Sequence, residues 1–121
     1  MSLLRNSTVK AVCVLQSLQG VIYFEEFGDI TLIQGTIKGL KPNGIHAIHI
    51  HEFGDLTEGC SSCCAHYNPF NMNHGGPNSA DRHVGDLGNI KTWLAQWLVI
   101  LRFSNAFLFF ISAFGSVTVF R

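Results

Sequence analysis

The stretch Gly44-Ile45-His46-Ala47-Ile48-His49-Ile50-His51-Glu52-Phe53 decides the fold class of this 121-residue chain. Histidines alternate with isoleucines in its centre, and successive side chains of a β-strand point to opposite faces. His49 and His51 therefore lie on the same face of the predicted strand, where their rings can chelate one metal ion. Paired histidines in strands are also common as packed or surface residues, so this pair alone leaves both interpretations open.

Three further stretches before this strand have the same β-forming character. Residues 8–15, 20–27 and 30–38 are rich in β-branched and aromatic side chains, and turn residues separate them. The turn Lys41-Pro42-Asn43-Gly44 leads into the fourth strand, residues 45–53. Four closely spaced strands predict an all-β fold, either an antiparallel sandwich or the wall of a barrel.

Residues 54–89 have no clear periodicity and consist largely of glycine, proline, asparagine, serine, cysteine and histidine. A stretch of this length without regular structure in a compact domain is usually either functional or wrongly assigned, and its histidines favour function. It contains His66, His74, His83 and Asp86, and three imidazoles with one carboxylate form a complete tetrahedral shell for zinc. Because metal binding can supply folding free energy, an ion here would also order the loop.

The composition of the chain changes near residue 90. Residues 1–90 hold five basic and all eight acidic side chains, all six histidines and all four cysteines. Residues 91–121 hold only Lys91, Arg102 and Arg121 as charged side chains, together with six of the ten phenylalanines and both tryptophans. We therefore predict a folded domain over residues 1–90 and a divergent hydrophobic tail over residues 91–121.

The tail allows three interpretations. Residues 93–120 contain one charged side chain in 28 positions, Arg102. This length exceeds the roughly 20 apolar residues that span a bilayer as a helix, so the first interpretation is a C-terminal membrane anchor. The second is buried strands, because Val117-Thr118-Val119-Phe120 has strand character. The third is a segment without an evolved fold.

The charge balance and the N-terminus narrow the classes of function. Eight basic and eight acidic side chains give a formal net charge of zero, which excludes a global basic field that binds nucleic acid nonspecifically. Residues 1–8 lack the charged start, apolar run and cleavage site of a secretory signal. The expected compartment is therefore the cytosol.

Several ordered motifs together resemble the copper/zinc superoxide dismutase family. They are Gly44–Asp55, Gly59-Cys60, His66-Tyr67-Asn68-Pro69, His74-Gly75-Gly76-Pro77 and Arg82–Asn89. The resemblance covers roughly residues 8–90 and implies a Greek-key β-barrel or sandwich, of which this chain keeps four N-terminal strands and the metal-binding loop. Residues 1–90 are then a partial domain of this family, followed by an unrelated apolar tail.

The resemblance implies copper and zinc as cofactors and superoxide as the substrate, which the family converts to dioxygen and hydrogen peroxide. It assigns His49, His51 and His66 to copper, and His66, His74, His83 and Asp86 to zinc. His66 is then the catalytic bridge between the metals, because its ring takes up a proton on copper reduction and later supplies it to the peroxide. His46 matches a histidine that the family uses structurally.

Two residues of the family's copper site have no counterpart in this chain. No histidine follows His83, so the fourth copper ligand is absent. Neither Arg102 nor Arg121 stands in the motif of the family's active-site arginine. We therefore expect a truncated or alternatively spliced form that departs from the family sequence near Ile90 or Lys91.

The cysteines also depart from the family pattern. Cys60 matches a half-cystine whose disulfide partner lies near the family's C-terminus, and this partner is missing here. Cys63 and Cys64 are additions, with Cys64 in place of a glycine. They either pair with Cys60, bind metal themselves or are inert.

Three hypotheses about function follow. The first is an antioxidant oxidoreductase, a copper/zinc superoxide dismutase. The second is a non-catalytic zinc- or copper-binding remnant, which the absent fourth histidine and arginine favour. The third is a membrane-associated metal-binding module that uses residues 93–120. The resemblance also implies a copper chaperone as a partner and a homodimer, part of whose interface belongs to the missing region.

Overall fold

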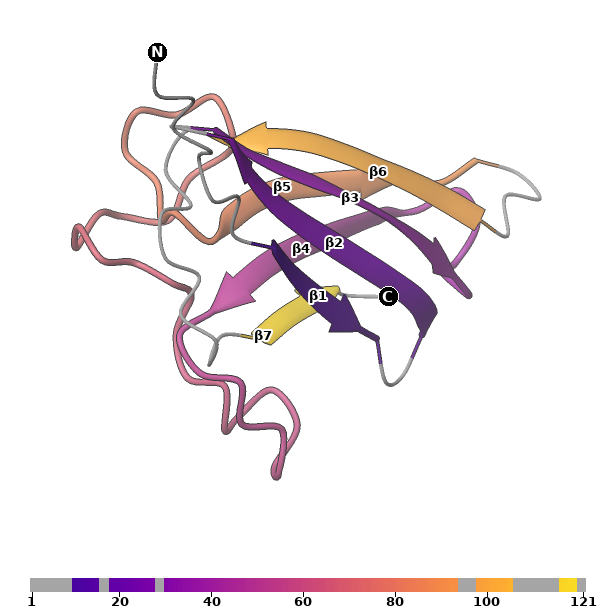
Figure 1. The fold of residues 1–121 in the computed structure, drawn as a ribbon, viewed down its shortest axis with the longest axis horizontal. Coiled ribbons are helices and arrows are strands. Elements are labelled where there is room, and N and C mark those ends of the chain that lie inside the picture. The colour runs from indigo at the N-terminus through magenta and orange to yellow at the C-terminus, as the bar shows by residue number, and fades with distance from the viewer. Residues whose placement is uncertain (1–9, 16–17, 28–29, 94–97, 106–115, 120–121) are drawn as a thin grey trace, which may run out of the picture.

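The computed structural model describes residues 10–15, 18–27, 30–93, 98–105 and 116–119. These residues form seven strands and no helix (Figure 1). The strands are β1 (Lys10–Val14), β2 (Gln19–Phe27), β3 (Ile30–Lys38), β4 (Ile45–His51), β5 (Asp86–Lys91), β6 (Leu98–Asn105) and β7 (Ser116–Val119). One antiparallel sheet has the order β1-β2-β3-β6 and the other has the order β5-β4-β7. The predicted all-β fold is confirmed.

The first three strands form the predicted meander. β1 pairs with β2, and β2 pairs with β3, in antiparallel register. In β3 the side chains of Thr31, Ile33 and Ile37 are buried, while the residues between them are half-buried or exposed. This period of two places one face of the sheet on the core and the other on solvent.

A single apolar core lies between the two sheets. Its buried members are Leu18, Ile22, Phe24, Ile33, Ile37, Leu40, Ile48, Ile50, Val84, Leu87 and Ile90. Four of the isoleucines have no exposed surface. Burial of each such side chain contributes roughly 1.5–3 kcal/mol, so this core is the main source of stability for the described part of the chain.

β4, the central strand of the second sheet, is buried on both faces. Ile48 and Ile50 belong to the core. His49 and His51 alternate with them and are only 8% and 6% exposed. The irregular segment between β4 and β5 covers this second face, since the ring of His66 contacts both histidines. The histidine face of β4 is therefore an internal surface between a sheet and a loop.

A bulge in the pairing of β4 with β5 decides which way Asp86 faces. Ile48 pairs with Gly88, but the next residue, His49, pairs with Asp86, so Leu87 is an extra residue in β5. Leu87 joins the core, whereas the carboxylate of Asp86 meets the histidines on the opposite face. Gly88 has a φ of +96°, which favours glycine, and bulges characteristically redirect a side chain in this way.

β5 begins inside the segment that the sequence indicated as irregular. The loop was predicted to continue through residue 89, but the strand runs from Asp86 to Lys91 and crosses the predicted boundary between residues 90 and 91. The loop prediction is therefore wrong for residues 86–89. It was misled by Gly88 and Asn89, which are residues typical of a turn. Pairing with β4 holds them in extended structure despite that composition.

Two segments of the predicted tail complete the sheets. β6 pairs with β3, and β7 pairs with β4. The interpretation of the tail as strands therefore holds for these two segments. Residues 94–97, 106–115 and 120 of the predicted membrane segment lie outside the described residues. Within the part of the chain that the structure describes, no helix has the length and apolar character needed to cross a membrane.

Candidate metal centre

The ring nitrogens of three histidines converge on one carboxylate oxygen. The Nδ1 atoms of His66, His74 and His83 lie 2.8, 3.0 and 3.4 Å from Oδ1 of Asp86. The Nδ1 atoms of His66 and His83 are 3.4 Å apart. The structure thus brings together the four residues that the sequence indicated for zinc.

These separations match the edges of a zinc coordination tetrahedron. Zinc binds histidine nitrogen at about 2.0–2.1 Å and carboxylate oxygen at about 2.0–2.2 Å, so neighbouring ligand atoms of a tetrahedral shell are about 3.3 Å apart. The four measured separations range from 2.8 to 3.4 Å. Three imidazole nitrogens and one carboxylate are also donors that zinc prefers. The residues therefore fit a zinc ion in both chemistry and spacing.

Backbone hydrogen bonds fix the carboxylate of Asp86, which is 1% exposed. The N–H groups of Gly75 and His83 donate to its Oδ2 at 3.1 and 3.0 Å, which leaves Oδ1 to the rings. Burial raises the pKa of Asp86, but these two hydrogen bonds and one from His66 lower it more, so the pKa lies below its ordinary value. The carboxyl group is therefore an anion at neutral pH, as a zinc ligand must be.

His66 lies at the centre of the histidine cluster. Its ring stacks on His49 with the centroids 4.0 Å apart and meets His51 edge-on at 5.1 Å. It also contacts the rings of His74 and His83, both at 5.4 Å. His66 thus joins His49 and His51 of β4 to the two histidines that follow it in the loop.

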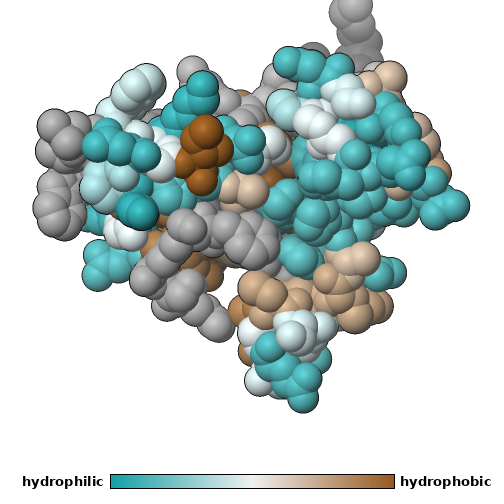
Figure 2. All heavy atoms as spheres, turned by 180° about the vertical axis from the view of Figure 1, so that it is seen from behind, coloured by the Kyte–Doolittle hydropathy of each residue, from teal (hydrophilic) through white to brown (hydrophobic). Residues whose placement is uncertain are grey.

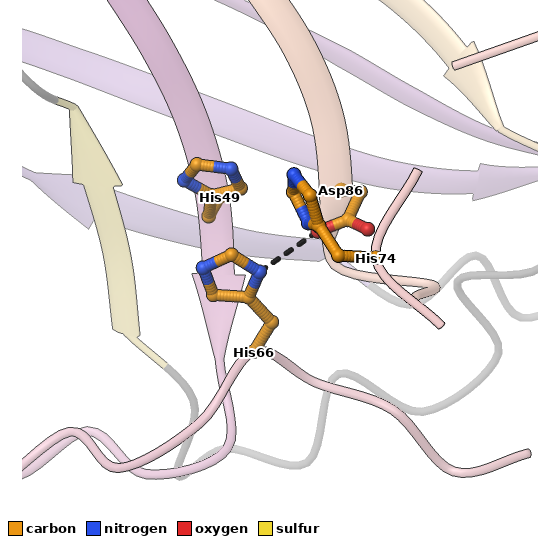
Figure 3. A group of neighbouring side chains, drawn as sticks. All are labelled: His49, His66, His74 and Asp86. Atoms are coloured by element: carbon orange, nitrogen blue, oxygen red, sulfur yellow. Dashed lines mark hydrogen bonds and ion pairs between the residues drawn. The ribbon is translucent and has the colours of Figure 1, made fainter. Parts of the chain in front are cut away.

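His49 reaches the same carboxylate from β4. Figure 3 shows its ring above that of His66, with Asp86 and His74 grouped on one side. These four residues offer ligand atoms that all lie within 4.8 Å of one another. The set around Asp86 Oδ1 described above contains the same three residues His66, His74 and Asp86. It differs only in having His83 where this set has His49.

His51 and His46 have different surroundings although both are buried in β4. The Nδ1–H of His51 donates to the carbonyl oxygen of Cys64 at 3.0 Å, which sets its tautomer and leaves Nε2 as the basic nitrogen. Nε2 of His46 lies 3.0 Å from the carbonyl oxygen of Lys41 and 3.3 Å from Oγ1 of Thr92. His46 is thus hydrogen-bonded near the start of β4, at the other end of the strand from His51, in keeping with a structural role.

Three backbone hydrogen bonds, which we call the Gly85 clamp, fasten the loop to β4. Tyr67 N donates to Ile50 O at 2.8 Å, Ile50 N donates to Gly85 O at 2.9 Å, and Gly85 N donates to Tyr67 O at 2.9 Å. A Cβ atom on Gly85 would lie 2.2 Å from Ile50 O, so only glycine fits here. Because His66 precedes Tyr67 and Asp86 follows Gly85, the clamp places both side chains.

Arg82 is a residue of this centre that the sequence did not single out. Its guanidinium donates to the carbonyl oxygens of Asp86 and His83 at 2.8 and 3.4 Å. These bonds close the turn that carries both residues. The only sign of this role in the sequence was its position directly before His83. That position did not single it out, because arginine is mostly a surface residue.

All four cysteines lie among the described residues, and none of them is in a disulfide. Cys60 and Cys64 are exposed, and the side chain of Cys63 is fully buried. Among the described residues, the group that could hold a metal ion contains no cysteine.

The buried histidines make the metal-free chain sensitive to acid. Burial, with His66 nearby, lowers the pKa of His49 from 6.5 to about 4, and burial also lowers the pKa of His66. The unfolded chain therefore binds more protons than the folded chain below pH 6.5, and the free energy of unfolding falls as the pH falls from 6.5 to about 4.

Thermal unfolding in the presence of a chelator tests this prediction. We expect the melting temperature to fall steadily from pH 7 to pH 4.5, and the slope to be smaller in His49→Gln, which has no ring to protonate. Equal slopes for the two chains would contradict it.

Comparison with known proteins identifies relatives of this chain. The family model of copper/zinc superoxide dismutase matches residues 18–108. The chain is 56% identical over 88 residues to superoxide dismutase (Cu-Zn) 4 of Dictyostelium discoideum, which covers 69% of this chain and 58% of that protein. It is 49% identical over 85 residues to the copper chaperone for superoxide dismutase of Mus musculus. This match covers 67% of this chain and 31% of that protein.

A solved structure is similar over more of the chain. The crystal structure of the clock protein EA4 matches with a TM-score of 0.74 and 34% identity, and covers 88% of this chain and 68% of that one. The chain thus spans 58% or less of the length of the two relatives described by sequence.

Proposed function

The chain belongs to the copper/zinc superoxide dismutase family, and on this basis we propose that it holds zinc and copper at the metal centre and disproportionates superoxide to dioxygen and hydrogen peroxide. This proposal rests on the position of His66. Its Nδ1 is part of the set with zinc spacing, and the same ring contacts His49 and His51. One ring that meets both groups can join two metal sites.

In this proposal, zinc has a structural task. Its ligands are His66, His74, His83 and Asp86, and the three Nδ1 atoms already lie 2.8–3.4 Å from Oδ1 of Asp86. His74 is the most exposed of the four, with 61% of its side chain accessible. A bound ion would hold this exposed ring against the buried carboxylate and thereby order the loop.

Copper has the catalytic task, with His49, His51 and His66 as its ligands. When bound, it supplies one-electron chemistry by alternating between two oxidation states. The carbonyl of Cys64 orients His51 so that Nε2 is the nitrogen available to the site. Because Nδ1 of His66 belongs to the zinc set, Nε2 is the nitrogen that would hold copper. Once released from copper, Nε2 would take up the proton that the ring then supplies to the peroxide.

A second candidate function is zinc binding without turnover. Residues 1–121 offer copper the three imidazoles of His49, His51 and His66, whereas the zinc set is complete by residue 86. The relatives also include proteins named copper chaperone for superoxide dismutase, and the one from Mus musculus covers 67% of this chain. Similarity alone therefore does not choose between catalysis and metal binding.

Reconstitution separates the two candidates. If the first holds, the purified chain loaded with copper and zinc removes superoxide in a copper-dependent way. We expect His49→Ala to lose at least about 90% of this activity and to keep its zinc, because the proposal assigns His49 to copper and the four zinc ligands stay intact.

Bound copper and zinc are counted in both chains by metal analysis. Near one equivalent of zinc with no superoxide removal by the unmodified chain would exclude the first candidate and support the second. Loss of zinc from His49→Ala would contradict the division of ligands between the two ions.

A further inference from the structure

Residues 52–65, which we call the cysteine loop, carry three of the four cysteines. The loop extends away from both sheets, at the lower left in Figure 1 and as a separate lobe at the lower right in Figure 2. Cys60 lies exposed near its tip, and the thiol of Cys63 is buried inside it. An exposed thiol three residues from a buried one is the arrangement of a reactive cysteine with a resolving partner.

The contacts of Cys63 bring its sulfur to the backbone of Cys60. Its thiol donates to the carbonyl oxygen of Gly59 at 3.4 Å and to that of Asp55 at 3.3 Å. The carbonyl carbon of Gly59 is bonded to the nitrogen of Cys60, so the sulfur lies beside this peptide unit. Residues 57–63 all lie in turns, which bring residues three apart in the chain closer together than an extended chain does. A disulfide bridges Cα atoms about 4.4–6.8 Å apart.

We propose that Cys60 and Cys63 are a peroxide-reactive thiol pair that closes to a disulfide within the cysteine loop and thereby changes the position of His51. In the first step the sulfur of Cys60 attacks hydrogen peroxide, the O–O bond breaks, and sulfenic acid and water form. In the second, the sulfur of Cys63 attacks the sulfenic sulfur and releases a second water. Two thiols are oxidised to one disulfide, and one peroxide is reduced to two waters.

The backbone links this pair to the metal centre. Phe53 N donates to Cys63 O at 3.2 Å, and Glu52 N donates to Ala65 O at 2.9 Å, so the two sides of the loop are tied at its base. Between these ties, the carbonyl of Cys64 accepts the hydrogen bond from His51. Closure of the disulfide takes the sulfur of Cys63 away from its two carbonyl acceptors. This shifts the adjoining peptide of Cys64, whose carbonyl group orients His51.

Oxidation of the full chain in the presence of a metal chelator tests the proposal. Hydrogen peroxide is added to the reduced chain, remaining thiols are trapped with N-ethylmaleimide, and the mass is measured. We expect two thiols to disappear together, with loss of two hydrogens and no gain of oxygen. In Cys60→Ser, oxidation of Cys63, located by peptide mass mapping, slows by at least about 10-fold, because this thiol is buried.

Two further variants assign the partner. Cys63→Ser keeps a hydroxyl donor for the same two carbonyls, and in this variant we expect Cys60 to gain oxygen instead of forming a disulfide. Cys64→Ser is the matched control and keeps the disulfide. Loss of the disulfide in Cys64→Ser, or gain of oxygen without a disulfide in the unmodified chain, would overturn the pairing.

Imidazole nitrogen NMR of the metal-free chain tests the effect on His51. We expect the signal of His51 to shift on oxidation and that of His46, at the other end of β4, to stay unchanged. An unchanged His51 signal would overturn the coupling. Because peroxide is supplied and metals are removed, this outcome is independent of whether the chain turns over superoxide.

Discussion

We expect Asp86→Asn to lower the affinity of the chain for zinc by at least about 100-fold, because in the proposed centre it removes a direct ligand. Loss of a residue that only orients a ligand already costs about 10- to 100-fold in affinity. Both oxygens of this carboxylate accept: Oδ1 faces the three rings, and Oδ2 accepts from the N–H groups of Gly75 and His83. Asparagine has the same size but one acceptor oxygen. Its amide nitrogen must therefore face either the zinc ligands or two backbone donors.

Competition with a chelator of known zinc affinity at pH 7 measures this loss. Asp81→Asn is the matched control, since Asp81 lies in the same loop but is exposed, and its carboxylate accepts from the N–H and the side-chain amide of Asn73. Its zinc affinity should change by less than about 3-fold, as for a surface substitution. A similar small change in Asp86→Asn would remove Asp86 from the zinc shell.

Gly85→Ala lowers the free energy of unfolding by about 3 kcal/mol, as expected when a buried backbone contact is forced apart. The added Cβ would lie 2.2 Å from Ile50 O and 3.0 Å from Tyr67 N. Relief of this overlap separates the loop from β4 and breaks hydrogen bonds of the Gly85 clamp. Zinc binding weakens together with stability, because His66 and Asp86 lie directly beside the clamp.

Urea denaturation with and without zinc measures both effects. Gly76→Ala is the control, because a Cβ at Gly76 meets nothing within 4 Å and its φ is not in the left-handed region. This substitution should leave stability unchanged or raise it by up to about 1 kcal/mol, since alanine restricts the unfolded chain. Equal stability of the two variants would show that the loop moves away from β4 at little cost.

The sequence was sufficient for the elements whose signal is local. The strands of the meander and β4 were found within two residues of their predicted bounds, because the alternation that makes them also buries one of their faces. The four residues indicated for zinc do lie together, and the sequence could point to them because histidine and aspartate have few other reasons to gather in a glycine-rich loop. β5 was missed because Gly88 and Asn89 read as a turn, and their extended structure comes from pairing with β4.

The amino-acid sequence of this protein was enough to fix the all-β class, the common face of His49 and His51, and the donors of the metal centre. Each of these follows from side-chain chemistry or from the period of two in a strand. The direction of Asp86 was settled by long-range packing, because the extra residue Leu87 turns the carboxylate from the core to the histidines. The contacts of His66 with both groups of histidines likewise depend on the Gly85 clamp, whose partners are far apart in the chain.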